Sequence, residues 1–219
     1  MENKKNILAG LFVLIILVIT GCSTEHQTES GITGNVVLDF EDEVVAVVNG
    51  NEILSSEVDL MKQSFARQGQ IISNPEVIEQ IINQKLVLGV AQEKGFFPSV
   101  EDAESEIETQ LMQQGMTIED YKTQIEIQGL SYSKQIEAIR GDIAIHSYLN
   151  AIIANSDIQV TEEEVLEFYE FYKEQAGDNV PPFEELESQI IMTLEQEREN
   201  EVISLVIDKL RKDAVIEYK

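Results

Sequence analysis

Residues 44–54 read VVAVVNGNEIL, and this stretch decides how the chain begins to fold. Two short runs that contain β-branched residues flank the pair Asn49-Gly50. Asn-Gly between two such runs predicts a type I′ turn, because both central residues of that turn need a positive φ angle. We therefore expect a β-hairpin with strands at residues 44–48 and 51–54.

The chain ends in a second segment with strand character. Residues 214–218 read AVIEY, and they follow a predicted helix over residues 183–213. A two-stranded hairpin alone is marginally stable in water. We therefore expect the C-terminal segment to dock on the hairpin as a third strand, which would bring the two ends of the folded part together.

The sequence between these strands has helical patterns. Ser55 or Ser56 is expected to cap a helix that runs to about Gly69, and Asn74 is expected to cap the next, which ends at Gly95. Further helices are predicted over residues 100–114, 117–129, 131–153, 161–175 and 183–213. The expected fold class is mainly α: a multi-helix domain, residues 44–219, with a small antiparallel sheet formed by the N-terminal hairpin and the C-terminal strand.

The first 22 residues are typical of an export signal. Lys4 and Lys5 precede an apolar run at residues 7–19, which is short for a membrane span and fits a signal-peptide core. The run ends in ITGC at residues 19–22, which is similar to the lipobox of bacterial lipoproteins. We expect Cys22 to receive a diacylglyceryl thioether and to become the new N-terminus, and residues 23–43 to form a flexible tether; an uncleaved N-terminal anchor is the alternative.

Composition argues against several classes of function. The chain has 15 Lys and Arg residues against 41 Asp and Glu residues, a formal net charge of −26, which repels the phosphates of nucleic acids. Its one cysteine allows no internal disulfide. His26 lies in the tether, which cannot hold catalytic geometry, and His146 lies on a helix rich in aliphatic residues, so we expect neither to act as the base of a nucleophile–base pair. Two separated histidines also argue against a zinc site. We expect no catalytic residue, no metal and no cofactor.

Several segments resemble SurA/PrsA-type chaperones in the same order along the chain. They are VAVVNG at residues 45–50, IINQKLVL at 81–88, SVEDAE at 99–104, TEEEV at 161–165, PFEEL at 182–186 and VIEY at 215–218. The resemblance covers about residues 44–218. It implies a helical cradle that shields unfolded exported polypeptides outside the cytoplasm.

One departure from the family pattern concerns catalysis. Members of this family commonly carry a parvulin-type prolyl isomerase domain between the two helices that correspond here to residues 161–175 and 183–213. The interval in this chain is only residues 174–181, and an independent domain rarely folds with fewer than about 40 residues. Prolyl isomerase activity is therefore not carried over from the resemblance.

The function we expect is that of a lipid-anchored, ATP-independent holdase on the extracytoplasmic face of the membrane or in the periplasm. Its partners would be unfolded or partly folded exported polypeptides. The alternatives are a non-catalytic adaptor or structural lipoprotein that binds one folded partner and, less favoured, a prolyl isomerase.

Adaptable methionines and aromatic side chains are the candidate client-binding residues. They are Met112, Met116, Tyr121, Ile125, Tyr132, Phe168, Tyr169 and Tyr172. For each of them core packing is the default expectation, against which client contact is weighed. Helical spacing predicts that Phe168 and Tyr172 share one face and that Phe171 is turned further round. The polar stretch at residues 195–201 is expected to be exposed on most faces, as in a projecting arm.

Overall fold

The structure, a computed structural model, describes residues 42–127, 129–177 and 180–219. The predicted signal segment, Cys22 and nearly all of the predicted tether lie outside the described residues. The chain divides into two compact units, one that includes residues up to Glu79 together with Ile216–Lys219, and one over Gln80–Val215. Each unit is described by itself.

The first unit is built on the predicted hairpin. Strand β1 (Val44–Val48) pairs antiparallel with β2 (Asn51–Leu54), with Val48 opposite Asn51. Asn49 and Gly50 have φ angles of 49° and 83°, as a type I′ turn requires. The hairpin prediction is therefore confirmed. A register irregularity between Val44 and Ala46 marks the start of β1.

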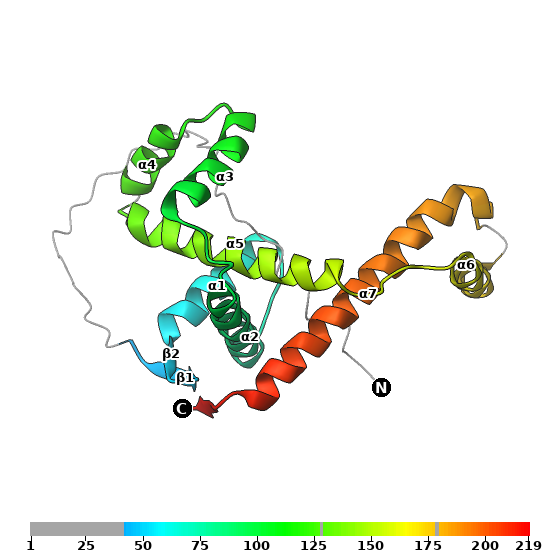
Figure 1. Cartoon of the computed structure of the whole chain (residues 1–219), viewed down its shortest axis with the longest axis horizontal. Helices are drawn as coiled ribbons and strands as arrows, with labels where there is room; N and C mark the ends of the chain where they lie inside the picture. The colour runs from blue at the N-terminus through cyan, green and yellow to red at the C-terminus, as the bar shows by residue number, and fades with distance from the viewer. Residues whose placement is uncertain (1–41, 128, 178–179) are drawn as a thin grey trace, which may run out of the picture. The chain divides into compact units, whose positions relative to one another are not determined.

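The C-terminal strand β3 (Ile216–Tyr218) completes a three-stranded sheet in the order β2-β1-β3 (Figure 1). It pairs antiparallel with β1, with Ala46 opposite Tyr218 and Val48 opposite Ile216. The Lys219 N–H extends the pairing with a hydrogen bond to the Val45 carbonyl at 3.0 Å. The predicted docking of the C-terminal strand on the N-terminal hairpin is confirmed.

Helix α1 (Ser55–Arg67) follows β2 without a loop, and its capping differs from the prediction. Leu54 is the N-cap residue, and the Ser55 and Ser56 hydroxyls both donate to Asp42 instead of capping the helix themselves. The Ser56 N–H also donates to Asp42, at 3.0 Å. The bonds from Ser56, hydroxyl first, hold the pKa of Asp42 below its usual value. The Asp42 carboxylate, which precedes the hairpin, thus satisfies one of the free N–H groups in the first turn of α1.

Helix α2 (Asn74–Glu93) also begins one residue away from the predicted cap. The Ser73 carbonyl accepts from the Val77 N–H, and the Ser73 N–H and hydroxyl donate to Glu76 at 3.0 and 2.6 Å. Ser73 therefore takes the capping position that the sequence analysis gave to Asn74. The Asn74 side chain instead accepts a hydrogen bond from Lys62 of α1 at 2.6 Å. The boundary between the two units falls within α2.

The second unit contains the remaining helices close to where the sequence predicts them. These are α3 (Val100–Gln113), α4 (Ile118–Ile127), α5 (Tyr132–Ala154), α6 (Glu162–Ala176) and α7 (Phe183–Asp213). Helices α3, α4 and α5 pack on one another, α5 also contacts α7, and α6 packs on α7. The mainly α fold with a small antiparallel sheet is therefore confirmed.

Aliphatic side chains make up most of the core. The largest fully buried side chains are Ile53, Ile82, Ile107, Leu111, Val48, Val77 and Val87. In the second unit the half-buried Arg211 of α7 donates a hydrogen bond at 2.7 Å to the amide oxygen of Asn83, which is 9% exposed. This bond joins α2 to α7 across 128 residues of sequence. A buried polar group of this kind needs its partner, since an unmet hydrogen bond costs stability.

Candidate functional site

The first turn of α6 is fixed by a reciprocal cap between Thr161 and Glu164. The Thr161 hydroxyl accepts from the Glu164 N–H at 3.3 Å, and the Glu164 carboxylate accepts from the Thr161 N–H and hydroxyl, each at 2.8 Å. These bonds, with the one from the Thr161 N–H first, hold the pKa of Glu164 below its usual value. The predicted capping box thus keeps a charged carboxylate at the start of α6.

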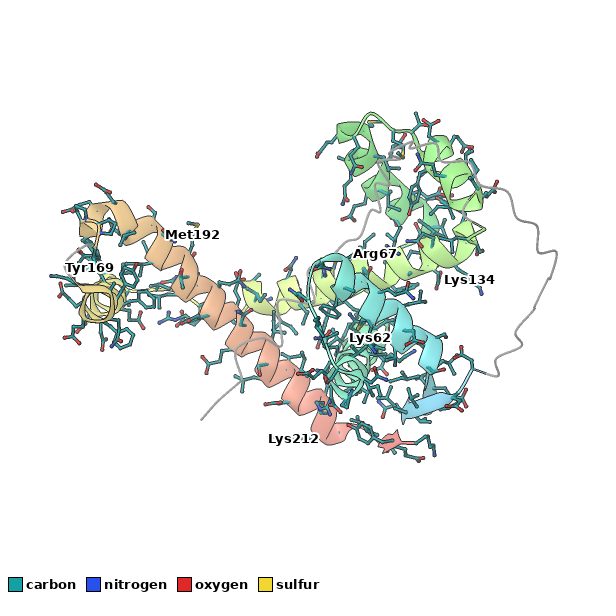
Figure 2. All side chains as sticks on the ribbon, turned by 180° about the vertical axis from the view of Figure 1, so that it is seen from behind. Lys62, Arg67, Lys134, Tyr169, Met192 and Lys212 are labelled. Atoms are coloured by element: carbon teal, nitrogen blue, oxygen red, sulfur yellow. The ribbon has the colours of Figure 1, made fainter. Side chains whose placement is uncertain are left out.

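Helices α6 and α7 are held together by a small apolar cluster. Val165, Tyr169 and Ile190 are buried at its centre. The Tyr169 ring (Figure 2) meets the Phe183 ring edge-on, with centroids 5.4 Å apart, and its hydroxyl donates to the Pro181 carbonyl at 3.0 Å. Tyr169 therefore ties α6 to the start of α7, and this pairing gives the two helices a defined separation.

Beside this cluster, the two helices enclose an open groove of about 430 Å³, which we call the α6–α7 groove. Its apolar lining consists of Phe168 and Phe171 from α6 and Leu194 from α7. Phe171 is 61% exposed, and Phe168 and Leu194 are half-buried. A partner side chain that covers these groups would remove apolar surface from water, which is the main source of affinity in such contacts.

The charged lining of the groove comes from both helices as well. It consists of Glu164 and Glu167 from α6 and Glu197, Arg198 and Glu201 from α7. The Arg198 guanidinium is bound to the Glu164 carboxylate, so the lone cation of the lining is already paired. Among the described residues, Glu167, Glu197 and Glu201 form no ion pair. The groove therefore combines apolar rings with unmatched negative charge.

A second group of predicted client-binding residues lies where α3, α4 and α5 meet. The rings of Tyr121 and Tyr132 pack edge-to-face with centroids 6.3 Å apart. The Tyr132 hydroxyl donates to Glu104 at 2.7 Å, and the Lys122 ammonium lies 5.0 Å from the Tyr132 ring centroid. Burial, together with the Glu104 carboxylate, raises the pKa of Tyr132. These contacts are typical of a helix junction and not of an open apolar surface.

The structure separates the eight predicted client-binding residues by exposure. Tyr121, Ile125 and Tyr169 are buried, Met116, Tyr132 and Phe168 are half-buried, and Met112 and Tyr172 are exposed. Residues buried in this way have no surface to offer a partner in this conformation. Of the five that are at least partly exposed, Phe168 lines the α6–α7 groove.

Most of the groove was not predicted from the sequence. Phe171, which was expected to lie off the face that Phe168 and Tyr172 share, lines the groove together with Phe168. The stretch at residues 195–201, which was expected to be exposed on most faces, supplies Glu197, Arg198 and Glu201 to the same lining. The signal was present as helical spacing, since residues 164, 167, 168 and 171 share one face of α6, and 194, 197, 198 and 201 share one face of α7.

The described residues include neither a metal-ligand cluster nor a membrane-spanning helix. No three His, Cys, Asp or Glu side chains come together within them as a candidate metal site. His146 lies half-buried in α5, one turn after the exposed Asp142. No helix in this part of the chain is both long and apolar enough to cross a bilayer.

Residues 41–149 match the family model described as the SurA N-terminal domain. Similar proteins include Chaperone SurA of Pseudomonas fluorescens, 27% identical over 147 residues, which cover 63% of this chain and 34% of that protein. The Foldase protein PrsA of Clostridium perfringens strain SM101 is 26% identical over 191 residues, covering 78% of this chain and 53% of the relative. The chain thus spans about a third to a half of the length of these relatives.

A solved structure shows the same fold at low sequence identity. It comes from a description of PEB4 and Cj1289 as structurally related SurA-like chaperones of Campylobacter jejuni. The superposition has a TM-score of 0.60 at 13% identity, and it covers 80% of this chain and 98% of the other. The α6–α7 groove lies beyond residues 41–149, so its description rests on the structure of this chain and not on the family match.

Proposed function

We propose that this chain, which is SurA-like over residues 41–149, is an ATP-independent holdase that binds non-native segments of exported polypeptides in its α6–α7 groove. The observation that carries the proposal is an open groove on a SurA-like helical fold, with the Phe171 ring 61% exposed. An unfolded client presents apolar side chains that a native protein buries. Shallow contacts with Phe168, Phe171 and Leu194 would hold such segments and release them without an energy source.

An aggregation assay tests this function. A chemically unfolded exported protein is diluted into buffer with the full chain in nanodiscs of zwitterionic lipid, and light scattering is recorded. We expect several-fold excess of the chain to delay aggregation relative to empty nanodiscs. No delay would refute the holdase proposal.

A matched pair of variants locates the activity. Phe171→Ser removes an exposed apolar side chain from the groove, whereas Leu205→Ser removes one that is 62% exposed on α7 but does not line the groove. Both changes should leave the far-UV circular dichroism spectrum unchanged. We expect only Phe171→Ser to shorten the delay. Capture of one stoichiometric folded partner, together with no delay for unfolded clients, would favour an adaptor instead.

We further propose a layout of three parts: a lipoprotein signal peptide at residues 1–22, a tether at 23–43 and the SurA-like domain at 44–219. The apolar run and the ITGC sequence at residues 19–22 support acylation of Cys22 at the extracytoplasmic face of the membrane. Two or three acyl chains would hold the protein stably, where one would be marginal. Metabolic labelling in a bacterial host with a clickable fatty acid should mark the wild-type chain and leave Cys22→Ser unlabelled; an unlabelled wild type argues against lipidation.

The proposed mechanism needs no enzymatic step. The family match is to the SurA N-terminal domain and not to a parvulin domain, and only residues 177–182 separate α6 from α7. A separate domain needs about 40 residues or more to fold without added cross-links. At high concentration, the chain should leave the cis–trans isomerisation rate of a proline peptide at its uncatalysed value, and a concentration-dependent acceleration would overturn this part of the proposal.

A further inference from the structure

The lining of the α6–α7 groove is asymmetric in charge. Four carboxylates and one guanidinium surround its apolar side chains, and that guanidinium, Arg198, is held by Glu164. Glu164 is in turn fixed by Thr161, whose N–H and hydroxyl both donate to it. Arg198 is therefore held by a carboxylate that is itself anchored to the start of α6. Three carboxylates of the lining are left unmatched.

These three carboxylates lie on the two walls of the groove. Glu167 belongs to α6, and Glu197 and Glu201 belong to α7. All three are exposed, and they line the same groove as the exposed Phe171 ring. A peptide that lays apolar side chains on Phe168, Phe171 and Leu194 therefore brings its neighbouring residues within reach of negative charge. Lysine and arginine suit this position, because their long aliphatic stems cover apolar surface while the charged ends reach outward.

We propose that the α6–α7 groove selects, among non-native segments, those in which apolar residues are flanked by lysine or arginine. This inference rests on the holdase function proposed above and names the class of client that the groove prefers. Apolar contact supplies the general affinity, and charge complementarity supplies the preference. Acidic segments of equal hydrophobicity are disfavoured, because their carboxylates would approach Glu167, Glu197 and Glu201.

Added salt distinguishes the electrostatic contribution to binding from the apolar contribution. Attraction between exposed charges is screened over about 8 Å at physiological ionic strength and over about 3 Å at 1 M salt. Apolar contact is not weakened in this way. The preference for basic segments should therefore shrink as salt is added, while the affinity for a neutral apolar segment should stay nearly constant.

The test uses three fluorescent peptides with the same apolar centre and flanks of lysine, glutamine or glutamate. Fluorescence anisotropy measures their binding to the full chain in nanodiscs of zwitterionic lipid, with the signal of empty nanodiscs subtracted. Each exposed charge pair contributes little alone, so three of them predict a preference of about fivefold to tenfold for the lysine peptide over the glutamine peptide. We expect the glutamate peptide to bind most weakly and 1 M salt to bring the three affinities together.

Two triple variants of equal net charge locate the effect. Glu167→Gln/Glu197→Gln/Glu201→Gln neutralises the groove and leaves Glu164 to cap α6 and hold Arg198. The control, Glu93→Gln/Glu106→Gln/Glu108→Gln, neutralises three exposed carboxylates that do not line the groove. We expect the groove variant to bind the lysine and glutamine peptides equally and the control variant to keep most of the preference.

The possible outcomes have distinct meanings. Equal binding of the lysine and glutamine peptides by the wild type would overturn the charge preference and leave the holdase function intact. Equal loss of preference in both triple variants would also overturn it, because the net charge of the chain would then be the cause. Failure of all three peptides to bind would count against the groove as the client site, which the aggregation assay tests independently.

Discussion

Removal of β3 is the perturbation that reports most clearly on how the C-terminal strand stabilises the N-terminal hairpin. A stop codon after Val215 deletes Ile216–Tyr218 and Lys219. The deletion removes three registered residue pairs with β1, the hydrogen bond from the Lys219 N–H to the Val45 carbonyl, and the bond of 2.6 Å from the Tyr218 hydroxyl to Glu79. Strand β1, which is central in the sheet, becomes an edge strand.

The expected cost follows from these contacts. If each registered pair contributes one net backbone hydrogen bond, the truncation lowers the free energy of unfolding of the first unit by ~2–4 kcal/mol. The remaining two-stranded hairpin is marginally stable in water on its own. Because exchange of a protected amide follows the opening free energy, the amides of β1 should exchange roughly 30- to 1000-fold faster.

Hydrogen–deuterium exchange followed by mass spectrometry measures this effect on residues 44–54, and urea unfolding of the 42–219 fragment gives the free energy. Glu217→Gln serves as the control, since it removes only the exposed ion pair with Lys219 and should change little. Unchanged exchange in β1 after truncation would refute the idea that β3 stabilises the hairpin.

Three further predictions concern the second unit. Ile190→Ala, at a position 5% exposed in the α6–α7 cluster, should destabilise the helix pair by ~2–4 kcal/mol, seen as faster amide exchange in α6. Arg211→Ala should lower the free energy of unfolding by ~1–3 kcal/mol in urea, because it removes the guanidinium that donates to the buried Asn83 amide oxygen, and Asn83→Leu in the same chain should recover part of the loss. Hydrogen bonds from the Thr117 hydroxyl first, and then from the Thr117 N–H, lower the pKa of Asp120. The ionised carboxylate therefore contributes its full stabilisation of α4 above the usual pKa of 3.8. That stabilisation is lost as the pH falls through the lower pKa that Asp120 has in the folded state. Thermal unfolding of Asp120→Asn at a series of pH values should therefore show a weaker loss of stability below about pH 3.8 than the wild type shows.

Much of the fold follows from local sequence signals. The Asn49-Gly50 turn, the starts of α3 to α6 at Ser99, Thr117, Ser131 and Thr161, and the two proline residues before α7 each act within a few residues. Docking of the C-terminal strand on the hairpin was also predicted, because a short hairpin needs a further strand, but the choice of β1 as its neighbour was not. Local chemistry therefore accounts for most of the elements, whereas the pairing of β3 with β1 joins residues that are far apart in the sequence.

The groove depends on information that is not local. The face of α6 that packs on α7 is set by Tyr169, which packs on Phe183 and donates a hydrogen bond to Pro181. The spacing of aromatic residues along α6 does not by itself predict which of them is buried against α7. Once Tyr169 and Val165 are buried, Phe168 and Phe171 lie along the groove. The caps of α1 and α2 also depend on side chains farther away along the chain: Asp42 binds the Ser55 and Ser56 hydroxyls, and Lys62 binds the Asn74 side chain that was expected to cap α2.

The central claim is that non-native polypeptide contacts the α6–α7 groove. A photo-crosslinking amino acid placed at Phe171, and at Leu205 as a position of matched exposure, tests it directly when an exported protein is added in unfolded or native form. The account predicts a strong crosslink at position 171 with the unfolded form, and little with the native form or at position 205. Equal crosslinking at both positions, or equal crosslinking to the native form, would contradict it.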